Sequence, residues 1–529
     1  MFKLSISLRA LNVIALLLLL PVFAAVEATT NTALFISIPY VGHVNPLISQ
    51  AVELQRRGWK VYIASCSHIK AYVETYRVEF IDIGYCPWVD GSKIILEKAC
   101  AMEKVSGLKL LIDWMIDAYP YMYNATLSVL RDKQLNVTIA IVDSFTIAGT
   151  DICNTLNISW VINNPDILLS VGNTVLQPAD YNPVTMMNNS IHTLGTNTVM
   201  RALQPLIRLL FEIELQLGFD LRWNKYRTDA GLTKPLGLSN RFLGHVILSN
   251  TAFGLEYSRP IPLHIQLTGP MLNMSTPKED YVNQLSVHDR QWLEEDNEKP
   301  VIYVSGGTVA SLSKAQVHKL LDALSSDKYR VTWKLSKKEA SYLSGSYVPK
   351  SIRIVEWVSS SLGYFAHDQV KVFISHCGIN SVYESVLLDT PIICLPMFAD
   401  QYDMGHQVSD AGVGICLDKV KFTSDELRTK IEEILKNKNY SLNIKRVQAQ
   451  IKLHGGVQRA ADIIETVAQF GSDMFISRDM SLPFYAKYNL DIYLIWFAAF
   501  YLSKRLIGYL FSRIFQRRTS LTMKAKKTD

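Results

Sequence analysis

The stretch between residues 356 and 401 constrains the fold most, because a strand, a glycine turn, a helix and a second strand follow one another there. Residues 370–375 alternate β-branched and aromatic side chains, which is typical of a buried strand. Asn380 or Ser381 can cap the helix that follows, and its apolar residues recur at helical spacing. The second strand covers residues 391–396. Strands joined through a helix in this way predict a parallel sheet.

The turn between the first strand and the helix predicts a phosphate-binding site. Unpaired backbone N–H groups and the positive end of the helix dipole meet at such a helix start. Around this turn the chain carries Trp357, Val358, His376, Gly378, Asn380, Ser381, Glu384, Asp400 and Gln401. Together these residues resemble the donor-binding signature of the UDP-glycosyltransferase family, and the resemblance extends from about residue 33 to residue 470.

The resemblance implies how the uridine of a UDP-sugar is held. Trp357 would stack on the uracil, main-chain groups of Val358 would pair with its edge, and Glu384 would accept hydrogen bonds from both ribose hydroxyls. The alternative for Trp357 is a place in the core. The family commonly has Pro-Gln where this chain has Ser359-Ser360.

The diphosphate is assigned by the same resemblance. His376 would contact a phosphate oxygen, and Asn380 and Ser381 would hold the diphosphate where the helix begins after Gly378. A second glycine turn, Gly306-Gly307-Thr308, follows a predicted strand at residues 300–305 and could bring N–H groups near phosphate, although a tight turn alone would also require glycine.

The sugar is assigned to the end of the signature. Asp400 and Gln401 would hold sugar hydroxyls in what the resemblance implies. The family often has Asn-Ala shortly afterwards, where this chain has Met404-Gly405. The sequence therefore does not say which sugar is bound.

In the first half of the chain, His43 and Asp143 follow two predicted strands. His43 lies in a turn after residues 32–40 and before a predicted helix at 47–57, and Asp143 ends a strand that begins at residue 139. Carboxyl ends of parallel strands share one edge, where open α/β sheets bind ligands. The resemblance makes His43 the general base that takes the acceptor proton and Asp143 the group that orients it. A surface or capping histidine and a helix-capping aspartate are the alternatives.

Length and charge limit the classes of protein. A chain of 529 residues exceeds one hydrophobic core, which predicts two domains, and 49% hydrophobic residues can fill such cores. The formal net charge is +6, but residues 504–529 contribute eight positive side chains and one carboxylate side chain, so the rest is near −1. The basicity is confined to a tail, which argues against a nucleic-acid partner.

Both ends of the chain predict membrane targeting. Lys3 and Arg9 precede an apolar run at 11–20 and small residues near Ala28, the pattern of a cleaved signal peptide covering residues 1–28. Glycosylation of a lumenal body could then occur at six N-x-S/T sequences, at Asn124, Asn136, Asn157, Asn188, Asn273 and Asn439.

Residues 489–511 predict a transmembrane helix. Residues 492–502 are uninterruptedly apolar, and snorkelling of Lys504 and Arg505 would extend the span. A surface-bound amphipathic helix is the alternative. The basic tail at 512–529 would be cytosolic, and Lys526 and Lys527 resemble a dilysine signal read by coat proteins, which predicts a single-pass type I protein of the endoplasmic reticulum membrane.

Seven cysteines cannot all pair, and none has zinc-ligand spacing. Cys394 is expected to be a core thiol because it lies in a predicted strand, while Cys86 and Cys100 are a candidate bridge. No metal or cofactor is expected besides the UDP-sugar as co-substrate.

These observations predict an α/β protein with two facing Rossmann-like domains, the GT-B fold, and a C-terminal transmembrane helix. The acceptor-binding domain would cover residues 29–275 and the donor-binding domain 276–471, with a connector at 472–488. The expected function is inverting transfer of a sugar from a UDP-sugar to a hydroxyl of a small lipophilic acceptor. A membrane-lipid acceptor (sphingoid, sterol or polyprenyl) and a non-catalytic nucleotide-sugar-binding paralogue are the alternatives, and a homo-oligomer is left open.

Overall fold

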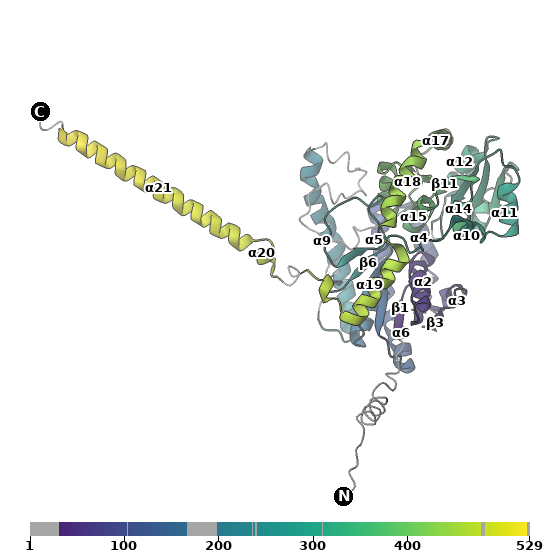
Figure 1. Cartoon of the computed structure of the whole chain (residues 1–529), viewed down its shortest axis with the longest axis horizontal. Coiled ribbons are helices and arrows are strands. Elements are labelled where there is room, and N and C mark those ends of the chain that lie inside the picture. Colours follow the sequence, from purple (N-terminus) through teal and green to yellow (C-terminus); the bar gives the residue numbers. More distant parts are fainter. Residues whose placement is uncertain are drawn as a thin grey trace, which may run out of the picture. The chain divides into compact units, whose positions relative to one another are not determined.

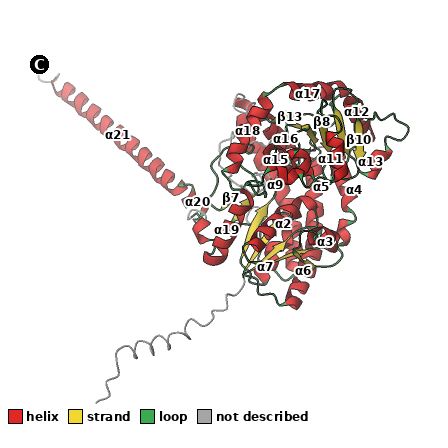
Figure 2. Cartoon of the chain, turned by 45° about the vertical axis from the view of Figure 1, so that its right-hand side comes forward, coloured by secondary structure: helices red, strands yellow, loops and turns green. Residues whose placement is uncertain are grey.

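The computed structural model describes residues 31–102, 104–166, 198–234, 236–237, 241–308, 310–477 and 482–525. The chain divides into a body, Met1–Ser472, and a C-terminal unit, Asp473–Asp529. The body contains two sheets with helices packed around them (Figures 1 and 2). This confirms the predicted α/β fold with two Rossmann-like halves.

The N-terminal sheet has seven parallel strands in the order β3-β2-β1-β4-β5-β6-β7. Strands β1, β4 and β5 are buried throughout, as expected where helices cover both faces of a sheet. The bounds are β1 (Thr32–Ile36), β2 (Lys60–Ser65), β3 (Glu79–Asp82), β4 (Ile139–Asp143), β5 (Trp160–Asn164), β6 (Ile247–Ser249) and β7 (Ile265–Leu267).

The C-terminal sheet has six parallel strands in the order β10-β9-β8-β11-β12-β13. Alternate residues of β8 enter different core clusters, Tyr303 on one face and Ile302 and Val304 on the other, so both faces are buried. The bounds are β8 (Val301–Ser305), β9 (Arg330–Lys334), β10 (Ile352–Val355), β11 (Val370–Ser375), β12 (Ile392–Cys394) and β13 (Gly414–Cys416).

Helices connect the strands of both sheets. In the N-terminal half they are α2 (Val41–Arg56), α3 (Lys70–Glu74), α4 (Ser92–Ala101), α5 (Lys104–Asp117), α6 (Tyr119–Lys133), α7 (Ile147–Thr155) and α9 (Thr198–Asp229). In the C-terminal half they are α10 (Lys278–Val282), α11 (Val287–Glu294), α12 (Lys314–Leu324), α13 (Lys337–Ser341), α14 (Ser361–Ala366), α15 (Ile379–Leu387), α16 (Gln401–Asp410), α17 (Ser424–Lys436), α18 (Asn439–Lys452) and α19 (Gly456–Phe470).

The strand orders fix two positions where chemistry can occur. In the first sheet β1 pairs with β4, and in the second β8 pairs with β11, so in each case the chain crosses to the other side of its starting strand. At such a switch point the connections after the two strands diverge and leave a crevice at the carboxyl edge. The residues that follow β1, β4, β8 and β11 are therefore the ones placed to bind a ligand.

Helix α2 begins six residues earlier than predicted. It starts at Val41, although Pro46 was expected to end a turn before the helix. Pro46 still fits inside α2 because its fixed φ is helical; the cost is the one N–H that proline lacks. His43 consequently lies in the first turn of a helix and not in a loop.

The expected N-cap of the helix after β11 is also wrong. Helix α15 begins at Ile379 with Gly378 at its N-cap position, so Asn380 and Ser381 lie inside its first turn and do not cap it. Helix α19 packs against α2 of the N-terminal half, where Arg57 forms ion pairs with Asp462 and Glu465 at 2.7 Å each.

The cysteine expectations are also corrected. Disulfides join Cys66 to Cys86 and Cys377 to Cys394, so Cys86 does not pair with Cys100 and Cys394 is not a free thiol. The two cysteines of each pair lie at or after the carboxyl ends of neighbouring parallel strands. These strands are β2 and β3 for the first disulfide and β11 and β12 for the second. Among the described residues Cys100 and Cys153 are free and buried.

The C-terminal unit contains the long helix α21 (Leu490–Ala525), preceded by α20 (Phe484–Lys487) (Figure 1). Residues Leu490–Gln516 are long and apolar enough to cross a membrane, and an 18-residue window within them has a mean hydropathy of 1.3. At 1.5 Å per residue these 27 residues rise about 40 Å, more than the roughly 30 Å hydrocarbon core of a bilayer. The Lys526 and Lys527 of the predicted signal, like residues 1–28, lie outside the described residues.

We predict that the Cys66–Cys86 bridge stabilises the N-terminal half. Replacing both residues by alanine should lower the free energy of unfolding by about 3 kcal/mol, since the bridge closes a loop with a sequence separation of 20 residues. Non-reducing peptide mapping and thermal unfolding measure the effect. An unchanged melting temperature, or a mapped Cys86–Cys100 peptide, would contradict the assignment.

Candidate active site

The structure brings His43 and Asp143 into contact at the switch point of the first sheet. Nδ1 of His43 lies 3.0 Å from Oδ1 of Asp143. The two meet because α2 follows β1 and Asp143 ends β4, and these strands are paired neighbours. The His43 side chain is 24% exposed, whereas Asp143 is completely buried.

The Asp143 carboxylate is held from two sides. Thr146 donates its hydroxyl proton to Oδ2 of Asp143 at 2.9 Å, and the Thr146 oxygen accepts a hydrogen bond from the Ile38 backbone at 2.8 Å. A carboxylate can only accept, so Nδ1 of His43 carries the proton and Nε2 is left as the basic nitrogen. This arrangement favours the orienting role over the helix-capping alternative.

Pro46 creates a contact between the two halves of the body. Within α2 the residue that would donate to the Gly42 carbonyl is Pro46, which has no N–H. The Asn380 side-chain amide of α15 donates to that carbonyl at 3.0 Å. The start of α15 therefore contacts the residue next to His43.

His376 lies at the switch point of the second sheet, between two glycines. A Cβ on Gly307 would approach Cε1 of His376 to 2.5 Å, and a Cβ on Gly378 would approach Nε2 to 2.5 Å. Gly307 also has a φ of +75°, which disfavours other residues. Both turns thus need glycine to admit the imidazole. Thr308 is exposed beside them.

Lys334 is a site residue that the sequence reasoning missed. Its Nζ donates to the Gly307 carbonyl at 3.1 Å and lies 3.7 Å from the ring centroid of Trp357. The available signal was its place at the carboxyl end of β9, next to β8 in the sheet. Trp357 itself is 60% exposed, which excludes the core alternative, and Val358 is buried.

Burial shifts the charges at this site. It lowers the pKa of Lys334 to about 8, against the opposing charge of Glu339. It lowers the pKa of His376 to about 4, with Lys334 adding to the effect, so His376 is neutral at pH 7. A neutral imidazole can hold a phosphate oxygen through an N–H but not through charge.

Two acids, Glu384 and Asp400, have raised pKa values. Burial raises the pKa of Glu384, on α15, to about 7. Burial and the nearby Asp403 raise the pKa of Asp400. Both side chains are partly exposed, as is His376.

Gln401 has a structural task in addition to any contact with sugar. Its side-chain oxygen accepts hydrogen bonds from the Met397 and Phe398 backbone at 2.9 and 3.3 Å, which fixes the turn before Asp400. Only its NH₂ group could therefore reach a sugar hydroxyl. Met404 and Gly405 are buried in α16.

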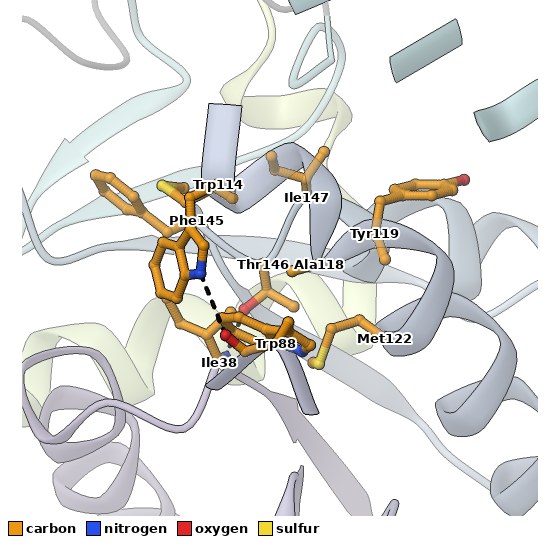
Figure 3. Close-up of a pocket in the computed structure, with 11 residues that line it drawn as sticks. Ile38, Trp88, Trp114, Ala118, Tyr119, Met122, Phe145, Thr146 and Ile147 are labelled. Carbon is orange, nitrogen blue, oxygen red and sulfur yellow. Dashed lines mark hydrogen bonds between the residues drawn. The ribbon is translucent and has the colours of Figure 1, made fainter. Parts of the chain in front are cut away.

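Figure 3 shows an apolar pocket in the N-terminal half, with Phe145 among the residues that line it. Phe145 lines it and also contacts the His43 ring edge-on, with centroids 4.8 Å apart. The cavity volume is about 10 Å³, which is room for about one water molecule, so the apolar side chains nearly fill this pocket. The other lining residues are Ile38, Trp88, Trp114, Met115, Ala118, Tyr119, Met122, Thr146, Ile147 and Ala148.

The remaining predicted residues lie away from these sites. Five of the candidate glycosylation sites lie within the described residues, and all five asparagines are exposed: Asn124, Asn136, Asn157, Asn273 and Asn439. The sixth, Asn188, lies outside the described residues. Within the same described part of the chain, no group of three His, Cys, Asp or Glu side chains is arranged to hold a metal ion.

Comparisons with solved structures identify the fold as GT-B. The kitacinnamycin glycosyltransferase superposes with a TM-score of 0.62 at 16% identity, covering 82% of this chain and 98% of that one. The calicheamicin glycosyltransferase CalG4 gives 0.57 at 15% identity, covering 84% and 99%. Both sheets of the body therefore belong to one known two-domain architecture.

A family model described as UDP-glucoronosyl and UDP-glucosyl transferase matches residues 121–491. The chain therefore belongs to the UDP-glycosyltransferase family. Rabbit (Oryctolagus cuniculus) UDP-glucuronosyltransferase 1A4 is 24% identical over 51% of this chain, which spans 48% of that enzyme's length. A UDP-glycosyltransferase of Talaromyces amestolkiae is 25% identical over 72% of this chain and 77% of its own.

We predict that Glu384→Gln stabilises the protein at alkaline pH. The pKa of Glu384 is about 7 in the folded state against 4.5 in the unfolded state, so its ionisation opposes folding progressively as the pH rises from 4.5 through 7. The free energy of unfolding of the variant should exceed that of the parent protein by about 2–3 kcal/mol at pH 8, and the two should be equal near pH 4.5. Urea unfolding at both pH values measures this.

The exposed Glu298 provides the matched control, since Glu298→Gln removes a carboxylate that lies at the surface. It should leave the pH dependence of stability unchanged. If both variants show the same pH dependence of the free energy of unfolding, Glu384 is not desolvated.

Proposed function

We propose that this protein transfers a sugar from a UDP-sugar to a hydroxyl group of a lipophilic acceptor, with inversion at the anomeric carbon. The observation that carries the proposal is the contact of His43 with Asp143, placed one residue from the Gly42 carbonyl that Asn380 of the donor helix binds. Family membership supports UDP-sugar as the donor. The sugar itself is left open.

The proposed step is a single displacement. Nε2 of His43 removes the proton from the acceptor hydroxyl, and the oxygen forms a bond to the anomeric carbon as the bond from that carbon to the UDP oxygen breaks. Asp143 stabilises the imidazolium that forms and keeps Nδ1 protonated. Attack from the face opposite to the leaving group gives inversion. Asp400 and Gln401 are the proposed sugar contacts.

The leaving UDP would be held through its diphosphate, its ribose and its base. The backbone N–H groups at the start of α15 face it, with Asn380 and Ser381 in the first turn. Lys334 supplies the positive charge that a neutral His376 does not. Glu384 would take the ribose hydroxyls, and Trp357 would offer its exposed face to the uracil.

The apolar side chains around the pocket that Phe145 lines support a lipophilic acceptor, although the pocket would have to widen to admit one. Its lining is aromatic and aliphatic, and Phe145 connects it to the base. A membrane lipid is the second candidate, favoured by the apolar helix segment Leu490–Gln516. The same segment supports the proposed single-pass anchoring in the endoplasmic reticulum membrane, and the exposed N-x-S/T sites are compatible with a lumenal body.

We predict that His43→Ala abolishes transfer without abolishing donor binding. Removal of a general base should lower kcat by a factor of about 10²–10⁴. Asp143→Asn should lower it similarly, because the amide can reverse the tautomer of His43. Membranes incubated with labelled UDP-glucose, UDP-glucuronate and UDP-galactose, with lipophilic phenols or membrane lipids as acceptors, measure transfer.

UDP binding by the purified variants is the control for correct folding, and it should match the parent protein. Transfer that continues unchanged in His43→Ala would refute the mechanism. A parent protein that binds UDP-sugars but transfers to neither acceptor class would support the non-catalytic alternative.

A further prediction concerns pH and Lys334. Its pKa of about 8 means that the ammonium is lost as the pH rises above 8, so the Kd of UDP should increase between pH 7.5 and 9.5 by up to about tenfold. Lys334→Met should bind UDP weakly throughout. Lys334→Arg, which stays charged, should bind with little dependence on pH. Calorimetry measures all three, and the same alkaline loss in Lys334→Arg would exclude this assignment.

A further inference from the structure

The turn that carries Trp357 is unusually well anchored for a surface turn. It lies between β10, which ends at Val355, and α14, which begins at Ser361. Trp357 projects with 60% of its surface exposed, so few contacts of its own fix it. A ring that is to stack on a flat base needs a rigid backbone beneath it, because ordering a mobile side chain on binding costs affinity.

Ser359 supplies one part of that rigidity. Its backbone N–H and its hydroxyl both donate to Oδ2 of Asp289, at 2.9 and 2.5 Å, and its hydroxyl oxygen accepts from the Ser286 backbone at 2.9 Å. Ser286 is the N-cap of α11, whose side chain accepts from the Asp289 backbone at 3.1 Å. Three hydrogen bonds thus tie one residue of the turn to the first turn of a helix.

Asp289 supplies the other part. Its second oxygen, Oδ1, accepts from the Tyr364 hydroxyl at 3.0 Å and pairs with Arg353 at 2.9 Å. Arg353 lies on β10, before the turn, and Tyr364 lies on α14, after it. One carboxylate, itself 3% exposed, therefore binds the strand, the turn and the helix.

The carboxylate form is needed for all of these contacts. Burial by itself would raise the pKa of Asp289, but the hydrogen bonds from Ser359 and Tyr364 and the charge of Arg353 lower it overall. The ion therefore persists at neutral pH. A buried charge that is satisfied from several elements fixes their relative positions, because any displacement leaves it unpaired.

We propose that Asp289 and Ser359 are positioning residues for nucleobase recognition, holding Trp357 and the Val358 backbone in the geometry that a uracil requires. The inference rests on the proposed function. It also accounts for the Ser359-Ser360 pair, which stands where relatives of this chain were expected to carry Pro-Gln: the Ser359 hydroxyl and N–H anchor the turn, a bond that proline could not make.

The test compares Ser359→Ala with Ser359→Thr and with Ser313→Ala. Ser359→Ala should weaken UDP binding and raise the KM of the UDP-sugar roughly tenfold, with kcat and the acceptor KM unchanged. Ser359→Thr keeps the hydroxyl and should restore binding. Ser313→Ala removes the N-cap of α12, a comparable stabilising contact elsewhere in the same half, and should affect stability but not UDP.

Base selectivity is the decisive second measurement. The ratio of the Kd of GDP to the Kd of UDP should fall in Ser359→Ala and in Asp289→Asn, because a loosened turn discriminates less. If the parent protein does not bind UDP, the proposed function fails. If it does, and Trp357→Ala weakens binding while Ser359→Ala changes neither affinity nor selectivity, only the positioning role is overturned.

Discussion

The parallel pairing of β1 with β4 and of β8 with β11 is the constraint on which the site depends. Each pairing reverses the direction in which its sheet grows, and the connections on the two sides leave room at the carboxyl edge. In the first sheet the residues brought together there are His43 and Asp143. In the second sheet they are the glycine turns around His376. Chemistry in both halves thus follows from strand order before any side chain is considered.

The contact between the halves follows from a missing hydrogen bond. A proline inside α2 leaves the Gly42 carbonyl without its helical donor. Asn380 of α15 satisfies it. Asn380 also lies in the first turn of the helix proposed to hold the diphosphate. One side chain therefore contacts both the proposed diphosphate site and the residue next to His43, the proposed general base. Helix α19, packed on α2, adds a second link between the halves.

Local patterns predicted the strands and the convergence of His43 with Asp143 because both depend on order along the chain and on one shared sheet edge. The disulfides could not be predicted in this way. Cys66 meets Cys86 only because β2 and β3 are neighbours, and sequence spacing does not contain that pairing. Lys334 was missed for the same reason: a lysine at a strand end is ordinary until the fold places it over Trp357.

Burial determines the charges of the residues in the proposed donor site. Burial moves Lys334, His376 and Glu384 toward their neutral forms, so the protein keeps little net charge in a poorly solvated place. A bound diphosphate would raise the pKa of Lys334, because a nearby anion favours the ammonium. Ribose hydroxyls that donate to Glu384 would lower its pKa, because they favour the carboxylate. Binding at pH 7–8 should therefore move protons in opposite directions at two residues. If a nucleotide binds at this proposed site, an anionic one is favoured because it would stabilise both charges at once.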